Sequence, residues 1–152
     1  MDRITRVAIA LGSNLGDRSA HLDVAAAHLA EFLNQLTVSR WYDTAPVGVV
    51  AQPRFLNGAA VGETALSPRE TLDRLLAIER ARGRERPFAG APRTLDLDLV
   101  LFGDQIVEER GLTVPHPRFR ERRFVLEPLN DIAPAMIDPV TGRTIADLLE
   151  TL

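Results

Sequence analysis

The stretch Arg-Thr-Leu-Asp-Leu-Asp-Leu at residues 93–99 opens a segment that alternates strongly as far as Phe102. Side chains two residues apart on a strand point to the same face. Asp96 and Asp98 therefore project together, while the leucines at 95, 97, 99 and 101 face the other side. The segment predicts a strand over 94–102 with one apolar and one acidic face.

Further elements are predicted on both sides of this strand. Upstream, Ser67 and Glu70 form a capping box that starts a helix reaching Arg82, and Glu79 continues the inner stripe of that helix. The other predicted elements are strands at 4–11, 37–42 and 55–64, a first helix to about residue 35, a return strand after 103–104, and helices at 122–131 and 144–152. The order β-α-β-β-α-β predicts an α+β, ferredoxin-like sandwich with an antiparallel sheet and C-terminal additions, in a single domain over 1–152.

The composition excludes several classes of protein. The chain has 152 residues, 45% of them hydrophobic, and no cysteine, which rules out a disulfide scaffold, a thiol nucleophile and a thiolate zinc site. All 18 basic residues are arginine, so a Schiff-base lysine and a P-loop lysine are excluded. The net charge of -3 argues against a general nucleic-acid coat. No segment approaches the roughly 20 apolar residues of a membrane span, and without a secretory signal we expect a cytoplasmic protein.

The acidic face of the 94–102 strand points to a metal site. Two carboxylates held this close repel each other unless a cation lies between them. A carboxylate pair with open water positions is a common way to hold Mg²⁺ together with nucleotide phosphates. The alternative is an exposed strand that carries two acids by chance. Because aspartate is disfavoured in strands, the pair favours the metal.

An arginine-rich segment precedes the acidic strand, with arginines at 80, 82, 84, 86 and 93. Arg80 and Arg82 suit the C-terminal end of a helix dipole, whereas the later three lie past Gly83 in a predicted loop. Guanidinium groups beside a metal site are suited to a polyphosphate, because they offset the charge that grows on a leaving phosphate. The loop is also suited to close as a lid.

Two further features are ambiguous when taken alone. His116 lies between two prolines and is followed by arginines at 118, 120, 122 and 123, which suits a second phosphate contact or a surface turn equally well. Asn57 is a polar residue inside an apolar strand, and it could either bind the edge of a flat heterocycle or anchor a loop. His21 and His28 lie beside the apolar stripe of the first helix and are interpreted as structural.

Taken together, these motifs resemble one known family. They are the segment at 93–99, Pro-His-Pro leading to Arg-Arg-Phe-Val-Leu-Glu-Pro-Leu, the opening Leu-Gly-Ser-Asn-Leu-Gly-Asp, and Phe-Leu-Asn-Gly-Ala. The chain resembles 6-hydroxymethyl-7,8-dihydropterin pyrophosphokinases of folate biosynthesis from Val7 to about Pro134. The resemblance implies a ferredoxin-like, Mg²⁺-dependent enzyme that transfers pyrophosphate from ATP to the hydroxymethyl group of the pterin and releases AMP.

The resemblance also implies roles for particular residues. Asp96 and Asp98 would hold two Mg²⁺ ions, with Asp96 also near the pterin, and either Asp98 or a metal-bound water would take the proton of the alcohol. The ATP contacts would be Glu79, Arg84, Arg86, Arg93, Leu99, Thr113, His116 and Arg122. The pterin contacts would be Thr44, Val47, Phe55, Asn57 and Phe124. Arg84, Arg93, Asp98, His116 and Arg122 would act in catalysis.

The sequence departs from some members of the family at two places. The stretch Phe88-Ala89-Gly90-Ala91-Pro92 has no tryptophan, and Phe55 stands where others have tyrosine. Two rival functions are an RNA-binding sandwich and a regulatory module that binds a ligand without catalysis. The first would present aromatic residues where this sheet presents Asp96 and Asp98, and the second would have no use for the arginine loop. We expect a monomer acting on small molecules, without nucleic-acid or membrane partners.

Overall fold

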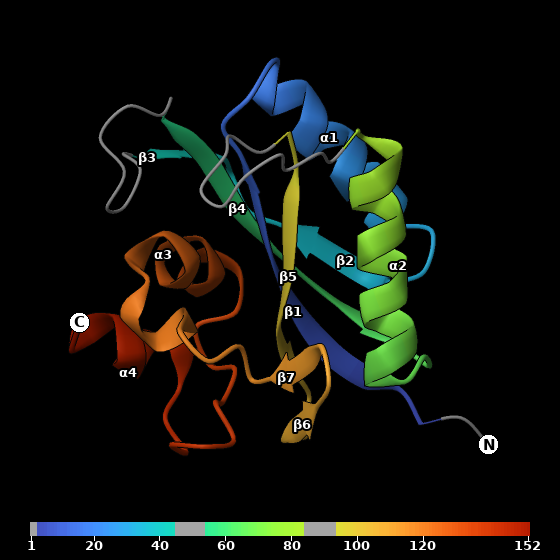
Figure 1. Cartoon of the computed structure of the whole chain (residues 1–152). Helices are drawn as coiled ribbons and strands as arrows, with labels where there is room; N and C mark the ends of the chain where they lie inside the picture. The colour runs from blue at the N-terminus through green and yellow to red at the C-terminus, as the bar shows by residue number, and fades with distance from the viewer. Residues whose placement is uncertain (1–2, 45–53, 84–93) are drawn as a thin grey trace.

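The computed structural model describes residues 3–44, 54–83 and 94–152, and an antiparallel sheet forms its centre (Figure 1). The strands β1 (Thr5–Ser13), β2 (Asn34–Val38), β4 (Phe55–Thr64) and β5 (Asp96–Phe102) run in the order β2-β4-β1-β5. The short strand β3 (Tyr42–Thr44) pairs with β4 beyond the end of β2. This order, with a helix after β1 and another after β4, confirms the predicted ferredoxin-like sandwich.

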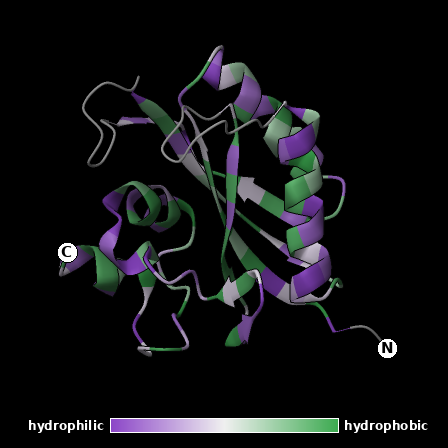
Figure 2. Ribbon diagram, viewed as in Figure 1, coloured by the Kyte–Doolittle hydropathy of each residue, from purple (hydrophilic) through white to green (hydrophobic). Residues whose placement is uncertain are grey.

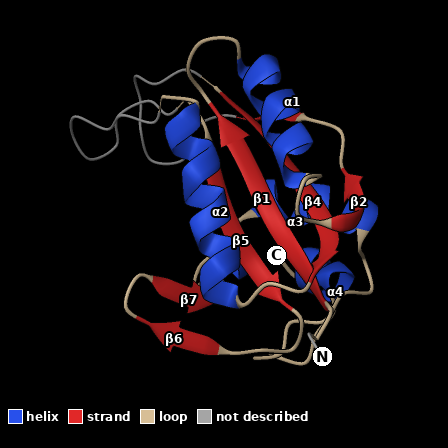
Figure 3. Ribbon diagram, turned by 90° about the vertical axis from the view of Figure 1, so that its right-hand side faces the viewer, coloured by secondary structure: helices blue, strands red, loops and turns tan. Residues whose placement is uncertain are grey.

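Helices cover both faces of the sheet. The helices α1 (Arg18–Leu29) and α2 (Pro68–Ala81) pack on one face, and α3 (Arg123–Ile132) and α4 (Ile145–Glu150) lie on the other, as Figure 1 shows. Figure 3 views the sheet from the side of α1 and α2. Between β5 and α3 the chain forms the hairpin β6 (Val107–Glu109) and β7 (Leu112–Val114) and a 3₁₀ turn, η1 (Phe119–Glu121). The capping box at the start of α2 is confirmed, since Glu70 N–H donates to Ser67 Oγ and Ser67 N–H donates to Glu70 Oε1.

The core consists of two layers separated by the sheet. On the α1 and α2 side the buried cluster includes Val7, Ile9 and Leu75, and on the α3 and α4 side it includes Ala8 and Leu126. The central strand β1 therefore contributes alternate residues to both layers, and it reads as a nearly continuous apolar run for this reason. Figure 2 shows the resulting concentration of hydrophobic residues along the sheet, interrupted by hydrophilic positions in β5.

One predicted orientation in β5 is wrong. Leu97 and Leu99 do face α1 and α2, but Leu101 belongs to the cluster beneath α3. The register explains the change, because Ile9 pairs with Leu99 while the adjacent Ala8 pairs with Leu101. Val100 is therefore the extra residue of a β-bulge, which shifts the alternation by one position.

Two predicted boundaries also differ from the structure. The first helix ends at Leu29 rather than near residue 35, and β2 begins at Asn34 after a tight turn in which Leu33 stays buried. Gln35, which adopts a φ of 51°, lies in β2 and not in the helix. The predicted strand at 4–11 likewise ends too early, because Gly12 and Ser13 are part of β1.

The single strand predicted over 37–42 is divided into β2 and β3. Ser39 replaces part of the ladder with its side chain, since its Oγ accepts the Ala59 N–H at 2.9 Å while its own N–H donates to the Ala59 carbonyl. Trp41 then folds toward α1, where its Nε1–H donates to Asp23. Gly58 accommodates the indole, because a Cβ at residue 58 would lie 2.4 Å from the ring.

Candidate active site

The candidate site begins with a row of residues across three strands at one end of the sheet. Gly12 of β1 pairs with Asp96 of β5 on one side and with Asn57 of β4 on the other. Neighbouring strands lie about 4.8 Å apart, so Asp96 and Asn57 stand about 10 Å apart with no side chain between them. A Cβ on Gly12 would approach Asn57 Oδ1 to 3.0 Å. The glycine therefore keeps the sheet surface between the two polar residues low.

The two aspartates share the face of the sheet on which α3 lies. Asp98 pairs with Ala10 and Asp96 with Gly12, and both β1 residues belong to that face. Both aspartates are half-buried. The strand is held from behind, because Leu97 between them donates its N–H to Glu79 Oε2 at 2.7 Å. Glu79, at 2% exposure, continues the buried stripe of α2, as predicted.

The donor set at this position suits Mg²⁺. Within residues 3–44, 54–83 and 94–152, no three histidine, aspartate or glutamate side chains gather into a site that could bind a metal by themselves. A pair of carboxylates is nevertheless sufficient for Mg²⁺ when substrate phosphates and water provide the remaining ligands. Asp96 and Asp98 provide such a pair, and the small residues Gly12 and Ala10 beside them leave space above the sheet.

A cleft of about 280 Å³ adjoins Asp98 on the outer side of β5. It is lined by residues of α2, β5, the β6–β7 hairpin and the segment after it: Leu72, Leu97, Asp98, Leu99, Gly111, Leu112, Thr113, His116 and Pro117. Four of the residues predicted from the sequence to contact the nucleotide or the metal are therefore brought together here. The cleft combines an apolar wall with a few polar groups, which is typical of a small-molecule site.

His116 projects from the segment that follows β7, and its backbone N–H donates to the Val100 carbonyl at 3.0 Å. Its Nδ1 accepts the Arg118 N–H, so the neutral ring carries its proton on Nε2. Burial lowers the pKa of His116 below its ordinary value, and the nearby Arg122 lowers it further, while Asp96 acts in the opposite direction. The structure thus brings His116, Arg122 and Asp96 within electrostatic range of one another.

A second polar group lies across the sheet from the aspartates. Asn57 is 6% exposed, and its Nδ2 donates to Thr44 Oγ1 at 2.5 Å. This hydrogen bond joins β4 to β3 and orients the amide. Phe55 begins β4 on the same side, and its ring lies 3.8 Å from the position of a Cβ on Gly12. The arrangement offers a polar edge and an aromatic face, which suit a flat heterocycle with hydrogen-bonding groups.

The arginines after His116 have different environments. The Arg122 guanidinium lies over the Phe124 ring of α3, 5.6 Å from its centroid. Arg120 makes two hydrogen bonds to the buried Asp138, with distances of 2.6 and 2.9 Å, and Arg123 pairs with Glu127 one turn along α3. Both arginines are engaged in the α3 and α4 layer.

Several predicted site residues lie outside the described ranges, namely Val47, Arg84, Arg86 and Arg93. Arg82, at the C-cap of α2, donates to His21 Nδ1 with its Nη2 at 2.7 Å, so both residues have the structural role expected of His21. Sequence reasoning missed Gly12, which appeared only within the motif Leu-Gly-Ser-Asn-Leu-Gly-Asp. It also missed Asp43, because a short strand between two loops gives no periodic signal.

Comparison with known proteins identifies one family along most of the chain. Residues 8–134 match the model of the family described as 7,8-dihydro-6-hydroxymethylpterin-pyrophosphokinase. A pyrophosphokinase of Pseudomonas aeruginosa that acts on 2-amino-4-hydroxy-6-hydroxymethyldihydropteridine is 44% identical over 149 residues, covering 96% of this chain and 91% of the relative. The corresponding Synechocystis protein is 43% identical over 145 residues, covering 93% of this chain and 73% of the relative.

A solved structure shows the same fold at much lower sequence identity. The wild-type HPPK-DHPS of Plasmodium falciparum, determined with pteroate, superposes with a TM-score of 0.77 at 16% identity. The alignment covers 99% of this chain but only 43% of the Plasmodium chain, so this chain corresponds to less than half of that protein. At this identity the likeness concerns the fold.

Proposed function

Because the chain belongs to the 7,8-dihydro-6-hydroxymethylpterin-pyrophosphokinase family, we propose which of its residues bind each substrate and act in the reaction. The family transfers a pyrophosphoryl group from ATP to a hydroxymethyldihydropterin in folate biosynthesis. The observation that carries the proposal is the row Asp96–Gly12–Asn57. It separates a polar and aromatic subsite on β3 and β4 from a carboxylate pair and cleft on β5. The pterin occupies the first subsite and the nucleotide the second, so that they meet above Gly12.

The pterin subsite reads the edge and the faces of the ring. The Asn57 amide, oriented by Thr44, supplies the hydrogen-bonding edge, and Val47 is a further pterin contact on sequence grounds. Phe55 of β4 and Phe124 of α3 supply the aromatic faces. Stacking on such faces is worth about 1 kcal/mol beyond area burial, and phenylalanine at position 55 retains it.

The nucleotide subsite is the cleft on the outer side of β5. Leu72, Leu97 and Leu112 provide its apolar wall, and Thr113 and the Nε2–H of His116 provide polar contacts. Arg122 adds positive charge on the α3 side for the phosphates. Arg84, Arg86 and Arg93 remain candidates for the same task from the sequence.

The reaction forms one bond and breaks another at the β-phosphorus. The hydroxymethyl oxygen of the pterin attacks in line with the departing oxygen of the α-phosphate, its proton is released, and AMP leaves. We propose that Asp96 and Asp98 hold two Mg²⁺ ions, which would polarise the β-phosphoryl oxygens and bring the two substrates together. The cationic side chains of the site offset the negative charge that grows on the α-phosphate.

The test of this proposal is a product analysis. The protein is incubated with ATP, Mg²⁺ and 6-hydroxymethyl-7,8-dihydropterin, and the nucleotides are separated. AMP formed in step with pterin consumption, and abolished by a chelator, supports the proposal. ADP would indicate ordinary phosphoryl transfer and contradict it.

Among the helices that the structure describes, none combines the length and the apolar composition of a membrane span. The cytoplasmic location, the monomeric state and the single domain over 1–152 stay predictions.

A further inference from the structure

The three residues of β3 are held from both sides of the sheet. Alternation along the strand places Tyr42 and Thr44 toward α3 and Asp43 toward α1. On the α3 side the Tyr42 hydroxyl donates to Asp131, which ties β3 to α3. On the α1 side Asp43 lies among charged groups from other parts of the chain. This short strand is therefore located by polar contacts, because it has only three paired residues to hold it.

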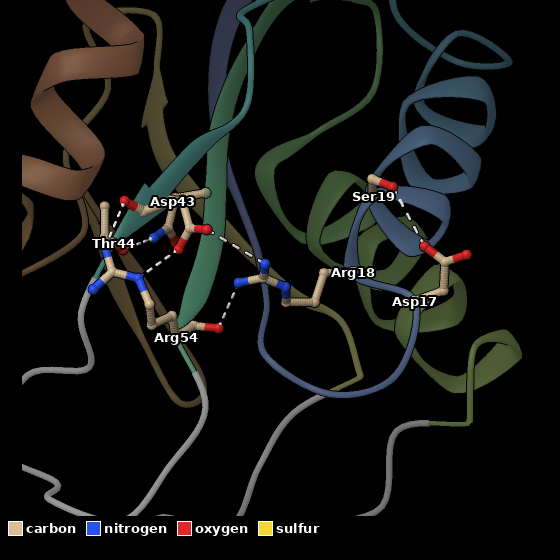
Figure 4. A network of polar contacts seen from close by, with 7 residues as sticks. Asp17, Arg18, Ser19, Asp43, Thr44 and Arg54 are labelled. Carbon is tan, nitrogen blue, oxygen red and sulfur yellow. Dashed lines mark hydrogen bonds and ion pairs between the residues drawn. The ribbon is translucent and has the colours of Figure 1, made fainter.

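Asp43 forms an ionic clamp with Arg18 and Arg54, shown in Figure 4. Arg54 donates its Nε–H to Asp43 Oδ1 at 2.8 Å and an Nη2–H to the Asp43 carbonyl at 3.2 Å. Arg18, from the first turn of α1, donates to Asp43 Oδ2 at 3.4 Å and to the Arg54 carbonyl at 2.8 Å. The Asp43 clamp thus joins the side chain and the main chain of β3 to the start of β4 and to α1.

The Asp43 clamp should contribute little to the overall stability of the fold. The side chains of Asp43 and Arg54 are 50% and 58% exposed, and exposed ion pairs contribute little to the free energy of unfolding. The pKa of Asp43 is lowered by its hydrogen bonds with Arg54 and then Arg18, so the carboxylate is charged throughout the physiological range. What the clamp does fix is the relative position of two strand ends.

Those strand ends carry the pterin subsite. Thr44 follows Asp43 directly, and Phe55 follows Arg54 directly. Thr44 Oγ1 accepts the amide hydrogen that orients Asn57, so a displacement of β3 would change the direction of the Asn57 amide. Misplacement of a binding group by about 1 Å is sufficient to cost a large part of its effect.

From these contacts we infer that Asp43 is a positioning residue for the pterin: with Arg18 and Arg54 it fixes the ends of β3 and β4, so that Thr44 and Asn57 present a preorganised polar edge. The inference rests on the proposed assignment of Asn57 to the pterin. Asp43 itself does not touch the substrate. Its removal should therefore affect pterin binding selectively and leave the nucleotide side of the site unchanged.

The first experiment is steady-state kinetics on Asp43→Ala. The KM for the dihydropterin should rise about tenfold, whereas the KM for ATP and kcat should stay within about twofold of the parent. Asp104→Ala is the control, because Asp104 forms an exposed ion pair with Arg3 away from β3. The charge-reversed double variant D43R/R54D should recover most of the pterin KM, which a merely destabilised protein would not do.

A second experiment uses salt. The dihydropterin is uncharged at neutral pH, so its binding at saturating non-hydrolysable nucleotide should depend on salt only through the protein. The calorimetric Kd for the pterin should rise in the parent between about 50 and about 500 mM NaCl, because salt screens exposed ion pairs. The same Kd should not change in D43A. Equal salt dependence in both proteins would contradict the inference.

The outcome for Asn57→Ala separates the two levels of the argument. If N57A raises the pterin KM while D43A and R54A leave it unchanged, the pterin subsite stands and the positioning role of Asp43 is wrong. If N57A itself leaves the pterin KM unchanged, both assignments are overturned. A rise in both substrate KM values in D43A, together with a lower melting temperature, would also overturn the positioning role.

Discussion

The Glu79 carboxylate accepts the backbone N–H of Leu97 at 2.7 Å, so α2 holds the residue that separates Asp96 from Asp98. Leu97 lies near the beginning of β5, a strand at one end of the sheet order. A side chain from a helix thus takes the place of a neighbouring strand. The backbone between Asp96 and Asp98 is fixed from the side of α2, and the two acidic side chains point to the opposite face of the sheet.

Glu79→Ala should therefore destabilise the protein. The variant leaves a buried N–H without its acceptor, and such a loss costs about 1–3 kcal/mol in the free energy of unfolding. Glu79→Gln keeps an acceptor oxygen and should lose less. Urea unfolding of both variants measures the difference. If E79A unfolded at the same urea concentration as the parent, the contact would have no structural role.

Asp96→Ala should abolish turnover without unfolding the protein. Asp96 is half-buried, so its truncation removes a proposed metal ligand and leaves the core intact. We expect a fall in kcat of at least about 100-fold, as for the loss of an electrostatic catalytic group, with a melting temperature close to that of the parent. The Mg²⁺ concentration for half-maximal rate should also rise in the milder Asp96→Asn variant. Unchanged turnover in D96A would exclude the metal role.

Gly12→Ala should weaken pterin binding. The new Cβ would lie 3.0 Å from Asn57 Oδ1, so the amide would have to move. We expect the pterin KM to rise by about threefold to tenfold, with the ATP KM little changed. Gly62→Ala is the contrasting variant, because its Cβ would contact Leu33 at the far end of β4. It should lower the melting temperature and leave the KM alone, and a similar effect of both variants on the pterin KM would contradict the local explanation.

His116 should titrate below its ordinary pKa of 6.5, because burial and then Arg122 disfavour its charged form. A histidine with a lowered pKa in the folded state adds stability that is present above 6.5 and is lost as the pH falls through the lower, folded value. The parent should therefore lose more stability than His116→Asn between about pH 7.5 and about pH 5.5, a range that includes the ordinary histidine pKa. NMR titration of the ring locates the midpoint directly. A midpoint at or above 6.5 would refute the prediction, and His21→Asn controls for the other lowered histidine.

Asp138→Ala should be strongly destabilising and catalytically silent in the folded fraction. Asp138 is fully buried and accepts two hydrogen bonds from Arg120, with further donors from Thr141 and Val140. Removing one partner of a buried pair costs about 3–5 kcal/mol in the free energy of unfolding. Chemical denaturation measures the loss, and kcat per folded molecule should match the parent. A specific loss of kcat would instead indicate that Arg120 contributes to the reaction.

Most of the fold could be predicted because its elements carry strong local signals. The limits Phe55–Thr64 of β4 were predicted correctly, and the capping box at Ser67 marked the start of α2. The division of β2 from β3 could not be predicted, because it depends on a hydrogen bond from Ala59 to the Ser39 hydroxyl across the sheet. The bulge at Val100 was equally hidden, since a run of apolar residues gives no sign of where alternation shifts.

The candidate site shows a similar limit. Spacing alone placed Asp96 and Asp98 on one face, and the structure agrees. Arg120 and Arg122 could not be told apart from the sequence. Arg120 is bound by Asp138, which lies 18 residues further along the chain. The role of Gly12 is evident only from the residues paired with it on both sides, Asp96 and Asn57. Long-range pairing, rather than residue type, decides these cases.

The outer edge of β5 has a consequence for solubility. Strands at the end of a sheet expose backbone groups that can pair with another molecule and lead to aggregation. Here the Leu97 N–H is already bound by Glu79, and the Val100 carbonyl is bound by the His116 N–H. The same two contacts that shape the cleft therefore also block edge-to-edge association of β5, and variants at Glu79 should be examined for precipitation as well as for activity.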